Sequence, residues 1–363
     1  MWSSLFPGVA ARNWLNTAHQ GPLPAVAVAA AERALAEKAA PFRIPDEAFE
    51  QRPARLRGLL AGLVGGRPDE IVLGNSTSHG LHLVANGLRW SEGDEVLLAE
   101  DDYPATVLPF RRLGRTRMAP RDRLADALTP RTRVVAVTWV DSFTGYAVDL
   151  DALGKACRAA GALLVVNASQ ALGARPLDVR RTPVDVVAAC GYKWLCGPYG
   201  TGFSWIRPEV LRELAPSQAY WLAQQSGGRL DHMRDYRIRD LGARGFDVFC
   251  PAAFLQNDTW AAAVELLTEI GVERIAAYDQ GLVQLILDRL DPDLYQLVSP
   301  ATGPERSTLV VLRPRTGSAT EVVARLAGSG VDVASREGNV RLAPHLFNTP
   351  DQIAEVAELL AVS

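Results

Sequence analysis

Residues 185–206 read DVVAACGYKWLCGPYGTGFSWI and hold two apolar runs that flank a lysine and a glycine-rich turn. Each run has the length and composition of a buried strand. Six such runs occur in the middle of the chain, at 71–73, 95–98, 134–140, 162–166, 185–189 and 202–206. Segments with apolar residues at helical spacing, such as 79–88 and 150–160, lie between them. This alternation predicts an α/β fold with a mostly parallel sheet that helices cover on both faces.

The loops that follow the strands are where we expect the functional site. In open parallel sheets, ligands bind beyond the carboxyl ends of the strands. The loops at that end of the predicted strands are 74–78, 99–106, 141–145, 167–173 and 190–200.

The composition of the chain changes after about residue 258. A long helical stretch at 259–290 is followed by short predicted elements that indicate a smaller α+β domain. These elements are strands near 294–298, 307–313, 331–335 and 339–343, and helices at 319–329 and 350–361. We therefore divide the chain into an N-terminal arm (1–24), a large domain (25–258) and a small C-terminal domain (259–363). The segment 207–250 has weak periodicity and is interpreted as a surface or interface stretch.

The overall composition favours a soluble cytoplasmic protein with a small-molecule substrate. The chain has 363 residues and a formal net charge of −3; 48% of its residues are hydrophobic and 22% are charged. No basic stripe is present for a nucleic-acid backbone, and no uninterrupted apolar stretch reaches the roughly 18 residues of a membrane span. The first 30 residues lack a secretory signal, and four cysteines without regular spacing indicate a reducing compartment.

Lys193 is the first candidate for chemistry. It is one of three lysines among 38 basic residues, and it stands between Tyr192 and Trp194 directly after a buried-looking strand. Desolvation lowers the pKa of a lysine and makes it a nucleophilic amine, which a Schiff-base lysine requires. The alternative is a lysine at a strand end whose ammonium group reaches water.

The segment GNSTSHG (74–80) is a candidate anion site. It follows a strand and opens a helix, so backbone N–H groups point outward and the hydroxyls of Ser76 and Thr77 add donors. An ordinary helix cap is the alternative. The spacing of a nucleotide-binding loop is absent, so a nucleotide is not the favoured anion.

Three further segments carry polar or aromatic side chains at strand ends. Tyr103 could stack on a planar ligand, Asn167 and Gln170 could orient a heteroaromatic ring, and Arg341 could bind a carboxylate. The alternatives are a surface tyrosine, amides that cap a turn and a solvated arginine. His345 is interpreted as a packing or capping residue. Together the segments indicate a flat, phosphorylated, aldehyde-bearing ligand with an amino acid as its partner.

The sequence resembles the class V aminotransferase family, whose members are fold-type I pyridoxal-phosphate (PLP) enzymes. This family includes cysteine desulfurases, kynureninases and isopenicillin-N-epimerase-like proteins. Ordered motifs spread over some 330 residues carry the resemblance, and the lysine motif looks most like the epimerase-like branch. The strongest are WLNTAHQGPLP (14–24), NASQALG (167–173), GYKWLCGPYGTGF (191–203) and VRLAPHLFNT (340–349).

The resemblance implies a role for each matching residue and a homodimer with active sites at the subunit interface. Lys193 matches the lysine that forms the Schiff base with PLP and moves the proton at Cα. The remaining matches are with phosphate-binding residues (Ser76, Thr77 and Tyr192), the ring-stacking residue (Tyr103), the residue near the phenolic oxygen (Gln170) and the arginine that holds the substrate α-carboxylate (Arg341).

Several positions depart from the family pattern. Asn167 replaces the aspartate that keeps the pyridine nitrogen protonated, and a neutral amide cannot hold a pyridinium by charge. Cys190 stands where a serine often meets the phosphate, and Cys250 lies in a turn whose threonine usually reaches the phosphate of the partner subunit. The loop before Arg341 has no cysteine, so we expect that the protein is not a cysteine desulfurase.

We therefore expect a PLP-dependent enzyme that acts on an amino acid or its conjugate, in specialised metabolism. Epimerisation at Cα, β-elimination such as C–S cleavage, and aminotransferase-type chemistry remain open, although Asn167 makes transamination harder. The alternative is a catalytically altered relative that binds a ligand or partner without ordinary turnover.

Overall fold

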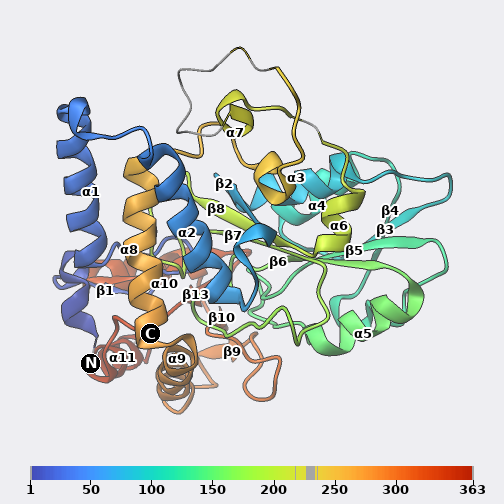
Figure 1. The fold of residues 1–363 in the computed structure, drawn as a ribbon. Coiled ribbons are helices and arrows are strands. Elements are labelled where there is room, and N and C mark those ends of the chain that lie inside the picture. Colours follow the sequence, from blue (N-terminus) through green and yellow to red (C-terminus); the bar gives the residue numbers. More distant parts are fainter. Residues whose placement is uncertain (1, 217, 226–233, 235, 362–363) are drawn as a thin grey trace.

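A seven-stranded sheet forms the centre of the computed structural model, which describes residues 2–216, 218–225, 234 and 236–361. Within the expected surface stretch 207–250, residues 217, 226–233 and 235 lie outside the described residues. In spatial order, the strands are β2 (Ile71–Gly74), β8 (Gly202–Ile206), β7 (Val186–Cys190), β6 (Leu163–Asn167), β5 (Thr132–Thr138), β3 (Glu95–Ala99) and β4 (Thr116–Ala119) (Figure 1).

The predicted fold class is confirmed. Strand β8 runs antiparallel to both of its neighbours, whereas β3–β7 pair in parallel. All six predicted strands are present, with ends shifted by up to two residues. The edge strand β4 was not predicted, because its sequence TRMA contains two polar residues and only its last residue is buried.

Alternate residues of each strand supply two separate hydrophobic cores, one on each face of the sheet. In β5, Val134 and Ala136 face one core, and Val135 and Val137 face the other. The first core also holds residues of α3 (Thr77–Gly87), α4 (Pro104–Arg111) and α6 (Pro208–Glu213). The second holds residues of α2 (Ala48–Val64), α5 (Leu150–Ala160) and α8 (Phe254–Ile270). Burying each valine contributes about 1.5–3 kcal/mol, so the strands are held from both sides.

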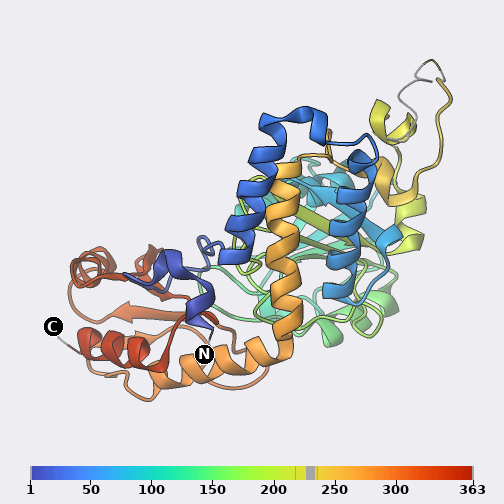
Figure 2. The same ribbon diagram turned by 60° about the vertical axis from the view of Figure 1, so that its left-hand side comes forward.

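The helical stretch expected at 259–290 is two helices rather than one. Helix α8 ends at Ile270 and α9 (Val272–Leu287) begins after Gly271, whose φ of 91° a helix cannot contain. Helix α8 packs against α1 (Ala25–Ala39) and α2, and the three helices stand side by side in Figure 1. Helix α9 then leads into the C-terminal elements (Figure 2).

The C-terminal elements form a small antiparallel sheet with helices. Its order is β12 (Ala334–Arg336), β13 (Asn339–Leu342), β10 (Val310–Pro314) and β9 (Tyr295–Leu297). Helices α10 (Ala319–Gly328) and α11 (Pro350–Leu360) contact it or each other. The strand predicted at 331–335 is two short strands, because β11 (Val331–Asp332) leaves this sheet to pair with β1 (Asn13–Trp14) of the N-terminal arm.

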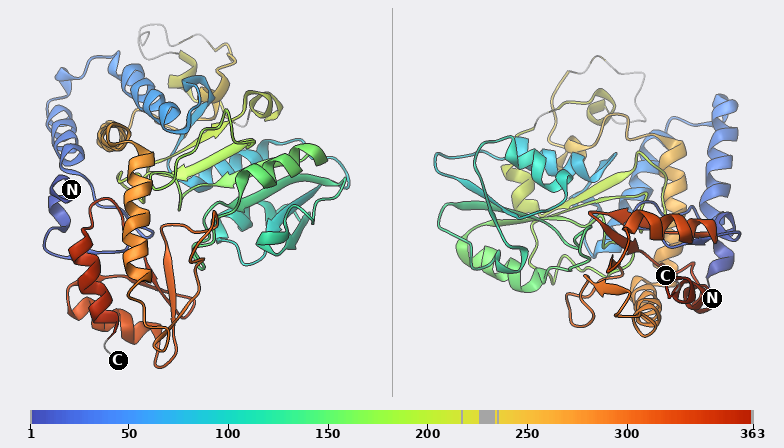
Figure 3. Two further views of the ribbon diagram at one scale, coloured as in Figure 1. Left: turned by 90° about the horizontal axis from the view of Figure 1, so that it is seen from below. Right: turned by 180° about the vertical axis from the view of Figure 1, so that it is seen from behind.

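The two parts of the molecule meet near the carboxyl ends of the large sheet's parallel strands. Figure 3 shows the C-terminal elements along one side of the large domain, with both chain ends on that side. The division at residues 24 and 258 stays a prediction, and α8 spans the second of these positions. No helix within the described part of the chain is long and apolar enough to cross a membrane.

Candidate functional site

Lys193 lies in the loop after β7, and the N-terminal arm closes over this loop. The amide of Gly21 donates to the Tyr192 carbonyl (2.9 Å). A Cβ atom at Gly21 would lie 2.1 Å from the Lys193 carbonyl oxygen, so only glycine permits this close approach. The side chain of Lys193 is buried, with 8% of the residue exposed.

The surroundings of Lys193 favour its neutral amine. Burial is the main cause that lowers its pKa, and the charges of Arg341 and Arg336 act in the same direction, while Cys190 opposes them. Its Nζ lies 5.5 Å from the ring centroid of Tyr103 and 5.9 Å from that of Tyr192. Among the described residues, Nζ has no hydrogen-bond or ion-pair partner. An unpaired buried amine of this kind is nucleophilic at neutral pH.

Tyr103 is held at the start of α4, where it is the N-cap residue and Pro104 follows at the first helical position. Its amide donates to a carboxylate oxygen of Asp102 (2.6 Å), and its ring stacks on Phe143 at 6.2 Å. The residue is 37% exposed, so one side of the ring is open beside Lys193.

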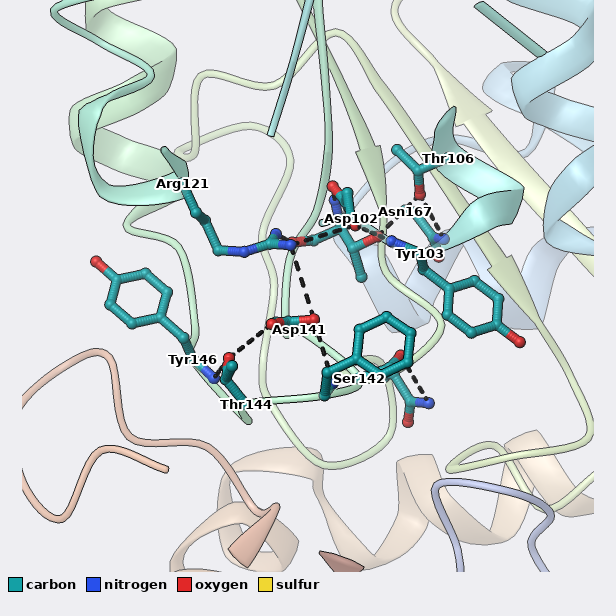
Figure 4. A network of polar contacts seen from close by, with 12 residues as sticks. Asp102, Tyr103, Thr106, Arg121, Asp141, Ser142, Thr144, Tyr146 and Asn167 are labelled. Atoms are coloured by element: carbon teal, nitrogen blue, oxygen red, sulfur yellow. Dashed lines mark hydrogen bonds and ion pairs between the residues drawn. The ribbon is translucent and has the colours of Figure 1, made fainter. Parts of the chain in front are cut away.

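Asn167 is the last residue of β6 and is 3% exposed. Its Oδ1 accepts a hydrogen bond from the Ser169 amide (3.1 Å), and its Nδ2 donates to Thr106 Oγ1 (2.9 Å) (Figure 4). A backbone N–H can only donate, so this contact fixes which side of the amide carries oxygen. One Nδ2 hydrogen is therefore left to donate to a ligand.

A network of polar contacts continues from Asn167 into the large domain (Figure 4). Thr106 Oγ1 contacts Thr138 Oγ1 (2.8 Å), and the Thr138 amide donates to Asp102 (2.9 Å). Arg121 lies between two carboxylates, 3.4 Å from Asp102 and 3.7 Å from Asp141. It also donates to the Thr138 carbonyl (3.0 Å). The network holds the loops that carry Tyr103 and Asn167 against each other.

The start of helix α3 is available to an anion. Ser76 is its N-cap residue, but no side chain caps the helix, because Ser76 Oγ bonds to Asn75 instead. Thr77 Oγ1 contacts Ser169 Oγ, which links this helix to the loop after Asn167. A Cβ atom at Gly202 would lie 2.7 Å from the backbone of Ser76, so β8 also packs tightly against the helix start. The open N–H groups and hydroxyls suit a phosphate.

Gln170 is buried and fastens three segments together. Its Nε2 donates to the Ala18 carbonyl (2.9 Å), and its Oε1 accepts from Trp194 Nε1 (2.9 Å). The contact of Nε2 with Ser142 Oγ is long, at 3.4 Å, and leaves this hydrogen available to a ligand oxygen. Gln170 thus joins the arm, the lysine loop and the loop after β5.

Tyr192 and Cys190 lie beside each other next to the lysine. Burial is the main cause that raises the pKa of Tyr192, and the Cys190 thiol acts in the same direction. The Tyr192 ring stacks on Tyr199 at 4.5 Å, and the Tyr199 hydroxyl donates to Gln20 of the arm (2.7 Å). Cys250, in contrast, is exposed.

Arg341 projects from β13 toward the large domain. It is 3% exposed, its Nη1 donates to the Ser142 carbonyl (3.0 Å), and its Nε has no hydrogen-bond partner among the described residues. Burial and the charge of Arg336 lower its pKa to about 10, which leaves it cationic at neutral pH. A buried guanidinium with an open donor is a carboxylate site.

His345 is a buried packing residue beneath the lysine loop. Its Nδ1 lies 2.7 Å from Asp279, its Nε2 lies 3.3 Å from the Trp194 carbonyl, and its ring packs edge-on against the Trp194 ring. The pair connects α9 to the residue after Lys193.

The structure brings the predicted segments to one place. The loops after β2, β3, β5, β6 and β7 contribute Thr77, Tyr103, Ser142, Asn167 with Gln170, and Lys193, and β13 adds Arg341. Sequence analysis did not single out Ser142, Ser169, Thr106, Arg336 or His19. Ser142 and Ser169 lie in loops that the strand pattern indicated, whereas no local signal marks Arg336, whose place depends on strand pairing.

Comparisons with known proteins identify similar chains. The family model described as Aminotransferase class-V matches residues 45–347. A protein of Aeropyrum pernix named probable cysteine desulfurase is 30% identical over 305 residues, which cover 76% of this chain and 71% of that protein. Isopenicillin N epimerase of Streptomyces clavuligerus is 33% identical over 234 residues, covering 59% of this chain and 58% of that one.

Solved structures share the fold. A C-DES mutant with glycine covalently linked to its PLP cofactor superimposes with a TM-score of 0.89 at 22% identity, covering 99% of this chain and 98% of that one. A second C-DES structure, described as a cystine C–S lyase in complex with its product cysteine persulfide, has a TM-score of 0.84 at 23% identity and covers 98% and 99%.

The exclusion of a cysteine desulfurase is wrong. Several relatives carry that name, including proteins of Methanothermobacter thermautotrophicus and Streptomyces coelicolor. The absence of a cysteine before Arg341 does not separate this chain from them. The alternative of a relative without ordinary turnover is also set aside, because these relatives are named as enzymes.

Proposed function

The chain belongs to the class V aminotransferase family of PLP-dependent enzymes, and we propose that it cleaves a C–S bond of a sulfur-containing amino acid. The observation that carries the proposal is the unpaired, buried amine of Lys193 beside the open face of Tyr103, with Arg341 ready to bind a carboxylate. The relatives named desulfurase and the structural likeness to a cystine C–S lyase support sulfur as the leaving atom.

The residues present fit the cofactor. The uncapped start of α3, with the hydroxyls of Ser76 and Thr77, would hold the phosphate, and Tyr192 beside Cys190 would border it. Tyr103 would stack on the ring, and Lys193 is the amine that would condense with the aldehyde.

Asn167 and Gln170 would contact the two polar edges of the ring. The free Nδ2 hydrogen of Asn167 donates, so it fits a ring nitrogen that is an acceptor and carries no proton. The loosely held Nε2 hydrogen of Gln170 fits a phenolic oxygen. A neutral ring partner withdraws electrons less strongly than a charged one, which disfavours transamination.

When bound, PLP supplies an aldehyde for the substrate amino group and an electron-withdrawing ring that weakens the bonds at Cα. Arg341 holds the α-carboxylate and so presents the Cα–H bond to the neutral amine of Lys193. Lys193 takes the Cα proton as a general base. The Cβ–S bond then breaks, sulfur leaves with the electron pair, and hydrolysis of the remaining fragment gives pyruvate and ammonium.

The first experiment establishes the cofactor and its lysine. The visible spectrum of the purified holoenzyme is recorded before and after borohydride, followed by peptide mass mapping. We expect a yellow band that vanishes on reduction and the cofactor mass on Lys193. Lys193→Ala should abolish both, whereas Lys155→Ala, an exposed lysine of α5, is the matched control and should change neither. A colourless protein that takes up no PLP would overturn the proposal.

The second experiment identifies the reaction. L-Cystine and L-cysteine are incubated with the holoenzyme, and pyruvate, ammonium, alanine and chiral amino acids are measured. Pyruvate with ammonium indicates elimination, and alanine indicates desulfurase-type cleavage; both support the proposal. Inversion at Cα without loss of sulfur would overturn it and favour an epimerase.

The assembly and compartment belong to the same proposal. We infer a homodimer, as is typical of the family, with its interface at the mouth of the site, where Tyr199 is 59% exposed. Light scattering of the purified protein tests this. The free thiols of Cys157, Cys190, Cys196 and Cys250 support a reducing, cytoplasmic compartment.

A further inference from the structure

We propose that the amino-acid substrate carries a second anionic group at the end of its side chain, and that Arg336 binds this group. The inference rests on the proposed function, since it assigns the α-carboxylate to Arg341. It goes beyond it by naming the class of substrate: a sulfur-containing amino acid with two acidic ends.

Strand register places the two arginines on one face of the small sheet. Ala334 pairs with Arg341 and Arg336 pairs with Asn339 in the antiparallel strands β12 and β13. Paired residues point to the same side, and so do alternate residues along a strand. Arg336 and Arg341 are therefore diagonal neighbours, which lie about 7–8 Å apart. The contact of Arg341 with the Ser142 carbonyl shows that this face is turned toward the large domain.

The opposite face of β13 belongs to a hydrophobic core. Val340 and Leu342 are fully buried in that core. The two arginines thus do not project into packing, and their face is the one that borders the lysine.

Charge at this end of the site is one-sided. Lys193, Arg341 and Arg336 act on one another, and all three lower the pKa of His19, for which burial is the largest cause. The acids that act on Lys193 and Arg341 are the Cys190 thiol and the Tyr103 phenol. Within the described part of the chain, no carboxylate forms an ion pair with any of the four basic groups.

One substrate carboxylate satisfies only part of this positive charge. Arg341 has a single open Nε donor and already holds Ser142 through Nη1. Arg336 is partly exposed, and its guanidinium makes one hydrogen bond, from Nη1 to the Ser335 carbonyl (2.7 Å). Its remaining donors face the region between Arg341 and His19, where a carboxylate would bind bidentately.

The test compares two ligands that differ only in the charge of the side-chain end. S-Carboxymethyl-L-cysteine and the nearly isosteric S-carbamoylmethyl-L-cysteine are titrated into the holoenzyme, and Kd is measured from the cofactor spectrum and by calorimetry. L-Alanine, which has no side-chain acid, reports binding through the α-carboxylate alone. We expect the carboxymethyl compound to bind about tenfold to a hundredfold more tightly than its amide.

Two variants locate the origin of this preference. Arg336→Gln should abolish it and leave L-alanine binding unchanged. Arg315→Gln is the matched control, because Arg315 follows β10 and bonds to Pro292 near the far edge of the same sheet, and it should keep the preference.

The outcomes separate the inference from the proposed function. Equal binding of the two ligands to the parent enzyme would overturn the inference, as would an equal loss of both ligands and L-alanine in Arg336→Gln, which would make Arg336 a support for Arg341. If no amino acid changes the spectrum of a protein that carries PLP, the proposed function fails instead.

Discussion

Two sets of arginines lie on either side of Tyr103, and they differ in how their charge is compensated. Arg121 of the large domain has a side chain that is 10% exposed and lies between Asp102 and Asp141. Arg341 and Arg336 of the small domain contact only backbone carbonyls. The paired charge is part of the fold, whereas the uncompensated charge becomes favourable only when an anionic ligand binds.

The physical basis of the difference is desolvation. Burying an ion is costly, and a fixed counter-charge with satisfied hydrogen bonds offsets much of that cost. Removing one member of a pair leaves its partner buried and unpaired. Removing an unpaired ion leaves nothing behind and relieves the cost. The two sets should therefore respond to mutation in opposite ways.

The largest effect on stability is expected at the paired arginine. Arg121→Met leaves Asp102 and Asp141 without their cation and should lower the free energy of unfolding by about 3–5 kcal/mol. Urea denaturation of the apo protein measures this change. Arg123→Met is the control, because Arg123 pairs with Asp126 at the surface, where both side chains are 66% exposed and the pair contributes about 0–1 kcal/mol. Equal effects of the two variants would remove the basis of the comparison.

Arg341 should show the reverse pattern. Arg341→Met removes a buried charge that has no counter-ion, so the free energy of unfolding should stay the same or rise. Binding of the substrate should suffer, with kcat/KM falling by about 30- to 1000-fold, or 2–4 kcal/mol. Steady-state kinetics with L-cystine and denaturation of the same sample test both halves. The cofactor spectrum should not change, and loss of PLP would show that Arg341 is misplaced in this account.

How far the sequence predicts this molecule depends on the range of the interactions involved. The six strands were readable because each is a continuous apolar run, and the candidate loops follow directly from their ends. The helix break at Gly271 is also local, but the apolar spacing on both sides of it conceals it. Strand β4 has no apolar run, because an edge strand is stabilised by backbone pairing.

The candidate site divides along the same line. Lys193 and Asn167 were found because each stands at the end of an apolar strand. The roles of Arg121 and Arg336 were not, because nothing local tells a paired arginine from an unpaired one. Arg121 meets carboxylates 19 and 20 residues away, from Asp102 to Arg121 to Asp141, and Arg336 reaches Arg341 through strand register.

Lys193 extends the comparison to pH. Burial lowers its pKa in the folded state below the ordinary value of 10.5. Between these two pKa values the unfolded chain binds more protons, so the stability of the parent rises with pH in that window. Apo Lys193→Met lacks this group and should be more stable than the parent at neutral pH, with the difference shrinking as the pH rises toward 10.5. Urea denaturation at pH 7 and pH 10 measures it; a constant difference would contradict the burial of a lowered-pKa amine.

The smallest effect is expected at Asn167, which tests the fixed amide directly. In Asn167→Asp, one carboxylate oxygen still accepts from the Ser169 amide, and the Thr106 hydroxyl can turn to donate to the other, so the fold should be kept. The carboxylate would then favour a protonated ring nitrogen in bound PLP. The chemical shift of ring-labelled ¹⁵N-PLP should change from that of an acceptor nitrogen in the parent to that of a protonated one in the variant. We expect C–S cleavage to change by about tenfold or less and transamination to rise, because a charged ring partner withdraws electrons more strongly. Thr106→Val is the control: it removes the hydroxyl that Nδ2 contacts but keeps the neutral amide, so the nitrogen should remain an acceptor. A parent enzyme whose ring nitrogen is already protonated would contradict the role given to Asn167.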